Sequence, residues 1–402
     1  MLDYFRKYIY FELLLILFFI NYRNPLNVYI NIAIIFYLTL LGLIYLIFKF
    51  KYTNYKKAQI NYNLSDKHIC IIGGSEGLGL SLAKRIIKEK PKTLTLMSRN
   101  IDKLKEAKKY LLKEIERKSN EEGDNYFGIK INIIKCDISI KESIKEAFDN
   151  ALTNNSLDIE ENEEDYIVSN STRSRKQKII KEECHLEEKN YIDVLICNAA
   201  YVTTGEYNKL QLYDLIYTIN TNIYGNIDIM SKVIINMKKK KSGLILFINT
   251  EGVLYPIYGF SYYLMSKSSM WTYTYILDQE LKYFNIHIVN AFLPSVDTPG
   301  FAQESIKKPD ITKKLENLTN TLNSDYVADK VINNVKKGKK FITLEFNGYI
   351  LSILHSNYRN PESYFDYLIY VSFSSLIVFI SSLYKLYIEY VIKKGVQSAL
   401  YN

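Results

Sequence analysis

Two residues in the second half of the chain have the types and spacing for acid–base chemistry: Tyr263 and Lys267. Residues four apart share one face of a helix, so the Lys267 ammonium is expected near the Tyr263 phenol. A free phenol has a pKa of about 10, and a neighbouring cation stabilises its phenolate. Such a pair could exchange a proton with a carbonyl or alcohol oxygen. The alternative is a surface pair, because the chain contains 36 Tyr and 52 Lys+Arg.

Two small polar residues upstream favour the chemical interpretation. Thr250 lies 13 positions before Tyr263, just after an apolar run at 244–248, and Asn222 lies 28 positions before Thr250. Side chains at the ends of strands in an α/β sheet are well placed to meet a ligand. We therefore predict that these four residues form one site.

A glycine-rich stretch at residues 73–79, GGSEGLG, follows a strand-like run and precedes a predicted helix at 80–88. Glycines permit a tight turn and close approach to a pyrophosphate, while the helix N-terminus supplies N–H donors. A plain turn would not need glycines at this spacing. The predicted cofactor contacts in this loop are Gly73, Ser75, Glu76, Gly77, Leu78 and Gly79.

The end of the next strand indicates which dinucleotide is bound. An acidic residue about 20 positions beyond the glycines usually binds a free ribose 2′-hydroxyl. Here Ser98 and Arg99 occupy that region, and a hydroxyl and a guanidinium suit a 2′-phosphate. The sequence thus favours NADP(H) over NAD(H). The alternative for Arg99 is a solvated residue in the first turn of a helix.

Short apolar runs alternate with amphipathic helices between residues 65 and 348. This pattern predicts an α/β fold, a doubly wound parallel sheet of the Rossmann type, because parallel neighbours need crossover connections. The seven expected strands are His68–Ile72, Thr93–Met97, Ile129–Cys136, Val194–Cys197, Leu244–Ile248, Ile286–Phe292 and Phe341–Phe346. Residues 154–190 lack periodicity and are expected to form a disordered insertion.

Composition excludes several classes of protein. The 402 residues are 48% hydrophobic and 24% charged, enough to bury a core. The four Cys form no CxxC pair and the four His are far apart, which argues against structural zinc and a disulfide framework. The net charge of +9 suits an anionic cofactor or membrane surface and is too diffuse to indicate nucleic acid.

Both ends of the chain have membrane character. Residues 24–48 carry no charge and are long enough to cross a bilayer, and 8–22 is a possible extra segment. Lysines after this span place the rest of the chain in the cytosol by the positive-inside rule. Residues 367–384 are also uncharged, but Lys385 favours an interfacial or re-entrant segment. We expect an anchor at 1–57, a catalytic domain at 65–348 and a membrane-associated segment at 349–402.

With these motifs in order, the chain resembles the short-chain dehydrogenase/reductase superfamily over about residues 66–348. Asn198-Ala199-Ala200 after the fourth strand adds to the resemblance. Within the superfamily, the segment DTPGFA at 297–302 is most similar to the 3-ketodihydrosphingosine reductases. Membrane segments at both ends also suit that family.

The resemblance implies a role for each matching position. Tyr263 would be the general acid, and Thr250, where the family has Ser, would bind the same oxygen. Lys267 would lower the phenol pKa and bind the nicotinamide ribose, and Asn222 would fix a water. Further cofactor contacts would come from Asp137, Asn198, Pro294 and Thr298. Ile72 departs from the family, which usually has a loop-bracing Thr there.

The expected activity is NADPH-dependent reduction of a long-chain 3-keto sphingoid base at the endoplasmic reticulum membrane, with the catalytic domain in the cytosol and no metal. A homodimer is implied by the resemblance. A steroid, a retinoid or a long-chain 3-ketoacyl thioester remains an alternative substrate, and an inactive NADP(H)-binding scaffold is an alternative of another class. Glu251 or Asp297 is a candidate partner for the substrate amine, although a solvated carboxylate is the simpler interpretation.

Overall fold

The structure, a computed structural model, describes residues 33–40, 42, 43, 45–47, 49, 62–122, 126, 128–153, 191–317, 321–355 and 364–400. The predicted insertion 154–190 and the possible segment 8–22 lie outside these residues. The chain divides into two compact units, residues 1–59 with 360–374 and residues 60–359 with 375–402. The second unit holds every predicted catalytic and cofactor-binding residue.

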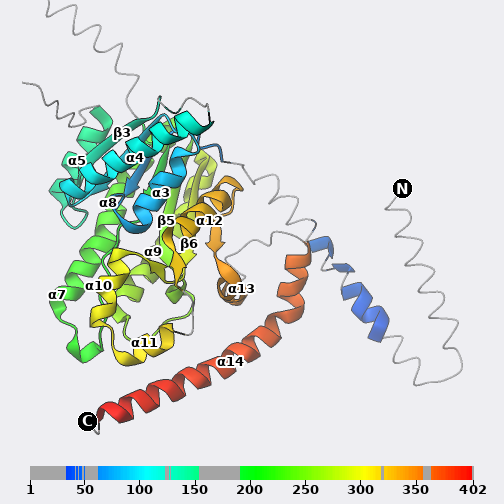
Figure 1. The fold of residues 1–402 in the computed structure, drawn as a ribbon. Helices are drawn as coiled ribbons and strands as arrows, with labels where there is room; N and C mark the ends of the chain where they lie inside the picture. The colour runs from blue at the N-terminus through cyan, green and yellow to red at the C-terminus, as the bar shows by residue number, and fades with distance from the viewer. Residues whose placement is uncertain are drawn as a thin grey trace, which may run out of the picture. The chain divides into compact units, whose positions relative to one another are not determined.

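A seven-stranded parallel sheet forms the centre of this unit (Figure 1), in the order β3-β2-β1-β4-β5-β6-β9. The prediction of a doubly wound parallel sheet is therefore confirmed. The order reverses between β1 and β4, and ligands of such sheets bind outside the carboxyl ends at this switch point. The strands are β1 (His68–Ile72), β2 (Thr93–Ser98), β3 (Lys130–Lys135), β4 (Val194–Cys197), β5 (Gly243–Thr250), β6 (Ile286–Leu293) and β9 (Phe341–Thr343).

Helices connect and cover the strands. They are α3 (Gly77–Ile87), α4 (Ile101–Glu122), α5 (Lys141–Thr153), α7 (Leu212–Ile219), α8 (Asn226–Lys240), α9 (Ser261–Leu281), α10 (Pro299–Lys307), α11 (Asp310–Glu316), α12 (Ser324–Lys336), α13 (Glu345–Leu354) and α14 (Tyr364–Leu400). A small second sheet pairs β7 (Val296–Asp297) with β8 (Leu322–Asn323). It was not predicted, because two-residue strands leave no periodic pattern.

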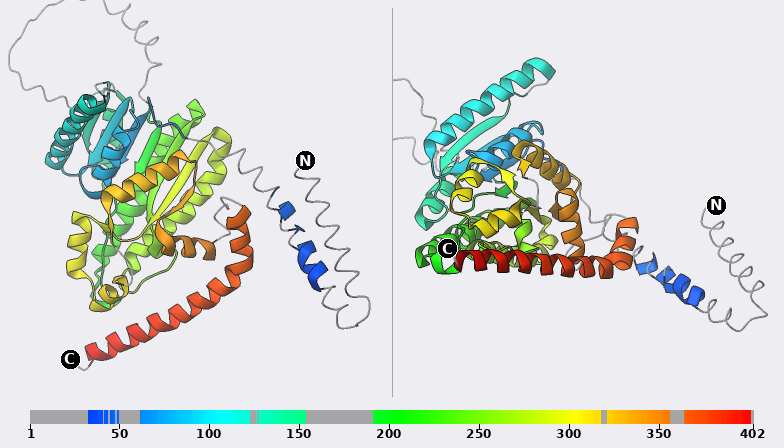
Figure 2. Two further views of the ribbon diagram at one scale, coloured as in Figure 1. Left: turned by 45° about the vertical axis from the view of Figure 1, so that its right-hand side comes forward. Right: turned by 60° about the horizontal axis from the view of Figure 1, so that its bottom comes forward.

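Two hydrophobic layers hold the helices on opposite faces of the sheet (Figure 2). One layer joins α3, α4 and α12 to the sheet, and the other joins α5, α8 and α9 to it. All five residues of β1 are buried, as expected for a central strand covered on both faces. This burial explains why β1 is apolar at every position after His68 rather than alternating.

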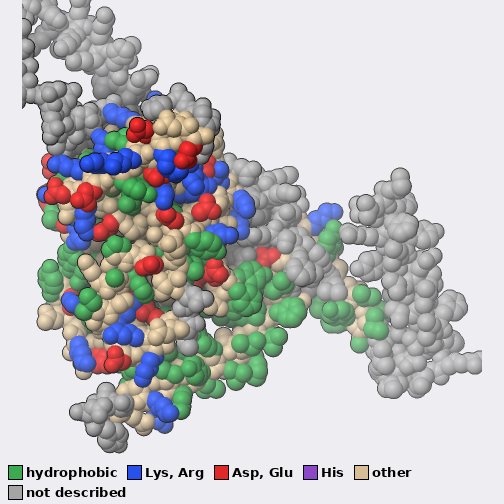
Figure 3. Space-filling model, viewed as in Figure 1, with side chains coloured by type: hydrophobic (Ala, Val, Ile, Leu, Met, Phe, Trp, Pro, Cys, Tyr) green, Lys and Arg blue, Asp and Glu red, His purple; other side chains and the backbone are tan. Residues whose placement is uncertain are grey.

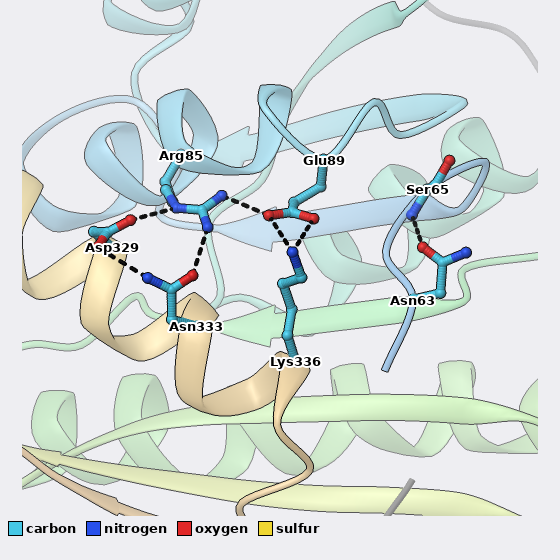
Figure 4. Close-up of polar contacts among 7 residues, drawn as sticks. All are labelled: Asn63, Ser65, Arg85, Glu89, Asp329, Asn333 and Lys336. Atoms are coloured by element: carbon cyan, nitrogen blue, oxygen red, sulfur yellow. Dashed lines mark hydrogen bonds and ion pairs between the residues drawn. The ribbon is translucent and has the colours of Figure 1, made fainter. Parts of the chain in front are cut away.

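A polar network fixes α3, the helix that follows the glycine loop, against α12 (Figure 4). The Arg85 guanidinium donates to Asp329, Glu89 and Asn333, each at 2.7 Å. Lys336 on α12 lies 2.7 Å from the Glu89 carboxylate. The side chains of Arg85 and Glu89 are only 11% and 12% exposed, so this pair is better shielded from solvent than an ordinary surface pair. The network ties the C-terminal end of α3 to α12.

The last predicted strand is too long at its C-terminal end. Residues 341–346 were expected to be extended, but β9 ends at Thr343 and α13 begins at Glu345. Glu345 has a φ of +60°, so the chain turns sharply there. The predicted boundary at residue 349 also falls inside α13, where Ser352 and Ile353 are buried.

Helix α14 carries the membrane character of the C-terminal end. Its segment Ser372–Gln397 is long and apolar enough to cross a membrane, judged by length and composition, with a mean hydropathy of 1.5. Exposed hydrophobic side chains gather along it (Figure 3), among them Phe379, Leu383 and Leu386. In the first unit, an apolar helix at Ala33–Ile47 covers part of the predicted span 24–48.

Candidate active site

The glycine loop turns tightly between β1 and α3. Gly73 and Gly77 have φ values of +79° and +55°, which L-residues with side chains rarely adopt. A Cβ atom on Gly79 would lie 1.9 Å from the carbonyl oxygen of Gly73. The backbone therefore needs glycine at these positions to fold back on itself and present its N–H groups.

Asn198 fixes the glycine loop by a side-chain hydrogen bond, which Ile72 cannot form because it lacks a hydroxyl group. Its side-chain Nδ2 donates to the carbonyl oxygen of Gly73 at 2.9 Å, from the end of β4. The backbone N–H of Asn198 also donates to the carbonyl of Ile72. The departure at Ile72 is thus accommodated by a residue predicted to line the cofactor site, and the loop remains fixed to both strands of the switch point.

The loop fits a dinucleotide pyrophosphate. No side chain caps the N-terminus of α3, and its N-cap residue Glu76 instead forms an ion pair with Lys103 at 2.7 Å. The first-turn N–H groups are therefore available to an anion. On the opposite side, a Cβ on Gly77 would lie 3.2 Å from Thr298, which follows β6 and caps α10 through the N–H of Phe301. Leu78 is buried and anchors the helix start.

The predicted adenosine end is polar and partly exposed. The Ser75 hydroxyl donates to that of Ser98 at 2.9 Å, which joins the glycine loop to the end of β2. The exposed Arg99 guanidinium forms a hydrogen bond with the Tyr217 hydroxyl on α7. Asp137, after β3, accepts hydrogen bonds from the N–H and hydroxyl of Ser139. This carboxylate closes a turn, so only part of its acceptor capacity remains for an adenine.

We expect Arg99→Ala to raise the KM for NADPH by about tenfold to a hundredfold, the loss typical of a charge-assisted hydrogen bond, and to leave the KM for NADH nearly unchanged. The reason is that only NADPH carries the 2′-phosphate. Steady-state kinetics with both cofactors measures the ratio. Arg117→Ala is the control, since it removes the same charge from the exposed face of α4. Equal effects of Arg99→Ala on both cofactors would contradict the assignment.

Helix α9 places Lys267 beside Tyr263, as predicted. The Lys267 side chain donates to the carbonyl oxygen of Ile248 at 2.8 Å, and its Nζ lies 5.9 Å from the centre of the Tyr263 ring. It also lies 5.0 Å from the Phe247 ring on β5. Lys267 is only 3% exposed, and this burial lowers its pKa to about 8. Around neutral pH the site therefore holds a desolvated cation next to a phenol.

The Tyr263 phenol has a pKa above its usual value, opposite to the direction expected from Lys267 alone. Burial is the larger cause, and the negative charge of Glu304 adds to it, because both disfavour a phenolate. Lys267 directs its ammonium to the Ile248 carbonyl rather than to the phenol oxygen. A phenol that remains protonated at neutral pH is suited to donating a proton, which is the role required in reducing a ketone.

Asn222 lies in a π-helical turn, η2 (Asn220–Gly225), between α7 and α8. Its side-chain amide is almost fully buried and bonds both backbone polar groups of Tyr201, at 2.7 and 2.8 Å, and the Ser266 hydroxyl on α9 at 2.9 Å. Asn222 thus ties the loop after β4 to the helix that carries Tyr263. The structure gives it a positioning role, and π-helical turns of this kind often mark functional sites.

Thr250 ends β5 at the carboxyl edge of the sheet, opposite Leu293 at the end of β6. Its Oγ1 accepts a hydrogen bond from the Gly252 N–H at 3.2 Å, which starts the short helix η3 (Glu251–Val253). An acceptor bond leaves the hydroxyl hydrogen free to point elsewhere. Pro294 follows Leu293 directly, so the predicted residues after β5 and β6 lie on adjacent strand ends.

Glu304 and Lys308 form part of the site and were not predicted. Lys308 lies 2.7 Å from both Glu304 and Glu316, and its side chain is 1% exposed. The spacing of Glu304 and Lys308 allows an ion pair on one helix face, but nothing in the sequence indicates that the pair packs against the residues around Tyr263. The rings of Phe260 and Phe301 have centres 5.4 and 4.3 Å from the Lys308 ammonium.

Neither predicted amine partner faces Tyr263. Asp297 is exposed and pairs with Asn323 in the small second sheet. Glu251 is partly buried against α13, where its Oε1 lies 2.2 Å from the position of a Cβ on Gly348. Burial, and then the charge of Glu345, raises the pKa of Glu251 to about 8. A carboxyl group that is neutral at pH 7 is a poor partner for an ammonium.

Two protein families match the chain over adjacent ranges: the KR domain at residues 68–159 and the short chain dehydrogenase family at residues 158–309. These ranges contain the glycine loop, Asn222, Thr250, Tyr263 and Lys267. Together with the sheet order, they show that the chain belongs to the short-chain dehydrogenase/reductase superfamily. Proteins of this superfamily use NAD(P)(H).

Several characterised proteins are similar over most of the chain. A 3-ketodihydrosphingosine reductase of Bos taurus is 24% identical over 291 residues, which cover 72% of this chain and 75% of the relative. A 3-dehydrosphinganine reductase of Arabidopsis thaliana is 24% identical over 314 residues, covering 77% and 80%. The corresponding reductase of Saccharomyces cerevisiae is 23% identical, covering 73% and 83%.

Solved structures agree on the fold. Levodione reductase superimposes with a TM-score of 0.52 at 15% identity, covering 70% of this chain and 97% of that one. A short-chain dehydrogenase from Sphingobium yanoikuyae in complex with NADPH gives 0.50 at 16% identity, covering 69% and 87%. At these identities the likeness shows the shared fold and nothing about substrate.

Proposed function

We propose that this protein reduces a long-chain 3-keto sphingoid base, 3-ketodihydrosphingosine, to dihydrosphingosine with NADPH. The observation that carries the proposal is the set of relatives named for this reaction, which match over more than 70% of the chain. The buried Lys267 beside the protonated phenol of Tyr263 supports it, because reduction of a ketone needs a proton donor at this point.

Different residues of the chain would bind the cofactor, donate the proton and stabilise the developing charge. The glycine loop, Ser98 and Arg99 would hold the phosphates of the dinucleotide, and Asn198, Pro294 and Thr298 would line its nicotinamide end. When bound, the reduced nicotinamide supplies a hydride. Tyr263 donates a proton to the ketone oxygen, and Thr250 donates a hydrogen bond to the same oxygen. Lys267 balances the negative charge that develops on the phenol oxygen.

The loop that follows Thr250 is apolar, which suits a substrate with a long alkyl chain. The loop after Thr250 contains buried Val253 and Leu254 and partly buried Tyr255. The Tyr255 ring lies 5.6 Å from that of Tyr384 on the apolar helix α14. A helix with membrane character therefore contacts the loop that follows the catalytic Thr250, and we propose that substrate reaches the site from the membrane along this contact.

We further propose location at the endoplasmic reticulum membrane with the catalytic domain in the cytosol, following the lysines after residues 24–48. A homodimer through α8 and α9 is part of the proposal. Both helices expose apolar side chains, including Ile235 at 58% and Ile276 at 48%. Exposed apolar residues on two helices are suited to contact a second copy.

The test is to purify the full chain in detergent and supply NADPH with either 3-ketodihydrosphingosine or a long-chain 3-ketoacyl thioester. Cofactor consumption and product mass are measured for each. We expect turnover of the amino-ketone and at least tenfold lower kcat/KM with the thioester, a difference of about 1.4 kcal/mol. A reversed preference would support the alternative substrate class, and NADPH binding without turnover of any ketone would support the inactive scaffold.

A further inference from the structure

Glu304 is a carboxylate that is largely shielded from water and whose charge affects the Tyr263 phenol. It lies on α10, the helix that Thr298 caps, and its side chain is 14% exposed. Its negative charge acts on the Tyr263 phenol, the group proposed to protonate the ketone.

Contacts connect Glu304 to the catalytic tyrosine through one buried cluster. The rings of Tyr263 and Phe260 have centres 6.1 Å apart. The Lys308 ammonium lies 5.4 Å from the Phe260 ring and 2.7 Å from the Glu304 carboxylate. Phe260 precedes α9 and Lys308 follows α10, so the cluster joins the helix of the phenol to the segment after β6.

The charges of this cluster do not cancel. Lys308 carries one positive charge and pairs with two carboxylates, Glu304 and Glu316, each at 2.7 Å. Both carboxylates are largely shielded from water, at 14% and 15% side-chain exposure. Burial raises the pKa of Glu304, and Lys308 opposes this. A second cation next to Glu304 would neutralise the cluster and favour the ionised carboxylate.

We propose that Glu304 binds the ammonium group of an amino-ketone substrate while Tyr263 acts on the adjacent carbonyl, and that it thereby selects substrates with a cationic head. This inference rests on the proposed function. In a 2-amino-3-ketone the ammonium is on the carbon next to the carbonyl, so its partner must lie near the proton donor. Glu304 is joined to the Tyr263 ring through Lys308 and Phe260, whereas Glu251 packs on α13 and Asp297 is exposed.

The experiment compares two substrates, 3-ketodihydrosphingosine and the same long-chain hydroxyketone without its amino group. For Glu304→Gln we expect kcat/KM for the amino-ketone to fall about tenfold to a hundredfold, the range for losing a hydrogen bond between charged groups. The value for the amine-free ketone should change less than about threefold, because that ketone offers no cation. Glu304→Asp, which keeps the charge on a shorter side chain, should lie between the wild type and Glu304→Gln.

Glu316→Gln is the matched control, because it removes the other carboxylate from the same lysine. It should have a thermal stability similar to that of Glu304→Gln and keep the wild-type preference between the two ketones. Equal loss on both ketones in Glu304→Gln, with NADPH binding intact, would assign Glu304 a structural role and overturn the inference. If the wild type reduces no amino-ketone, the proposed function itself is wrong. If Glu304→Gln does not fold, an unchanged preference in Glu304→Asp would overturn the inference.

Discussion

Tyr263→Phe is expected to lower kcat for ketone reduction by about a thousandfold, within the range that a positioned general acid contributes. The substitution removes one hydroxyl and keeps the ring that packs near Phe260. The phenol pKa is raised, so this hydroxyl is protonated at neutral pH, as the proton donor that we propose must be. Single-turnover measurements with saturating NADPH would separate this loss from an effect on cofactor binding.

Tyr262→Phe is the control for that substitution. This substitution removes the same hydroxyl group from the residue that precedes Tyr263 on α9. Adjacent helix residues point about 100° apart, so Tyr262 and Tyr263 do not share a face. We expect Tyr262→Phe to keep nearly full activity. If Tyr263→Phe retained more than about a tenth of the wild-type kcat, a different proton donor would have to be sought.

Most of the sheet could be predicted from the sequence because its strands are buried on both faces. Such strands are short β-branched runs bounded by polar turns, and the ends of β1 and β4 agree with the prediction to the residue. The end of β9 could not be predicted in this way. Phe346 continues the apolar pattern, but the turn at Glu345 depends on a backbone conformation that the pattern does not encode.

The site could be predicted where its residues act through fixed spacing along one element. Tyr263 and Lys267 share a helix face, and the glycines serve a single turn. The contacts that were missed act across elements: Asn198 was predicted, but not that its amide braces the distant glycine loop, and the Lys308 pairing with Glu304 and Glu316 was not predicted at all. Pairings of this kind depend on tertiary packing, which a local pattern cannot specify.

Lys267→Met tests the electrostatic half of the site. We expect kcat/KM to fall at least about a hundredfold, because the phenolate that forms on Tyr263 loses its neighbouring cation. The free energy of unfolding should not fall. Burial lowers the Lys267 pKa from 10.5 to about 8, so holding the ammonium inside the fold costs about 3 kcal/mol at neutral pH. Losing its hydrogen bond to the Ile248 carbonyl costs about 1 kcal/mol, which leaves a net gain of about 2 kcal/mol.

The difference in unfolding free energy between Lys267→Met and the wild type should depend on pH. Between about pH 8 and 10.5 the unfolded wild-type chain binds a proton that folded Lys267 has released, so wild-type stability rises with pH in this window. Lys267→Met lacks this group, and its advantage should therefore shrink as the pH increases from 7 to 10. Denaturant unfolding of both proteins at several pH values measures the difference. A constant difference, or a variant less stable than the wild type at pH 7, would show that the buried ammonium is stabilised by the fold rather than merely tolerated for catalysis.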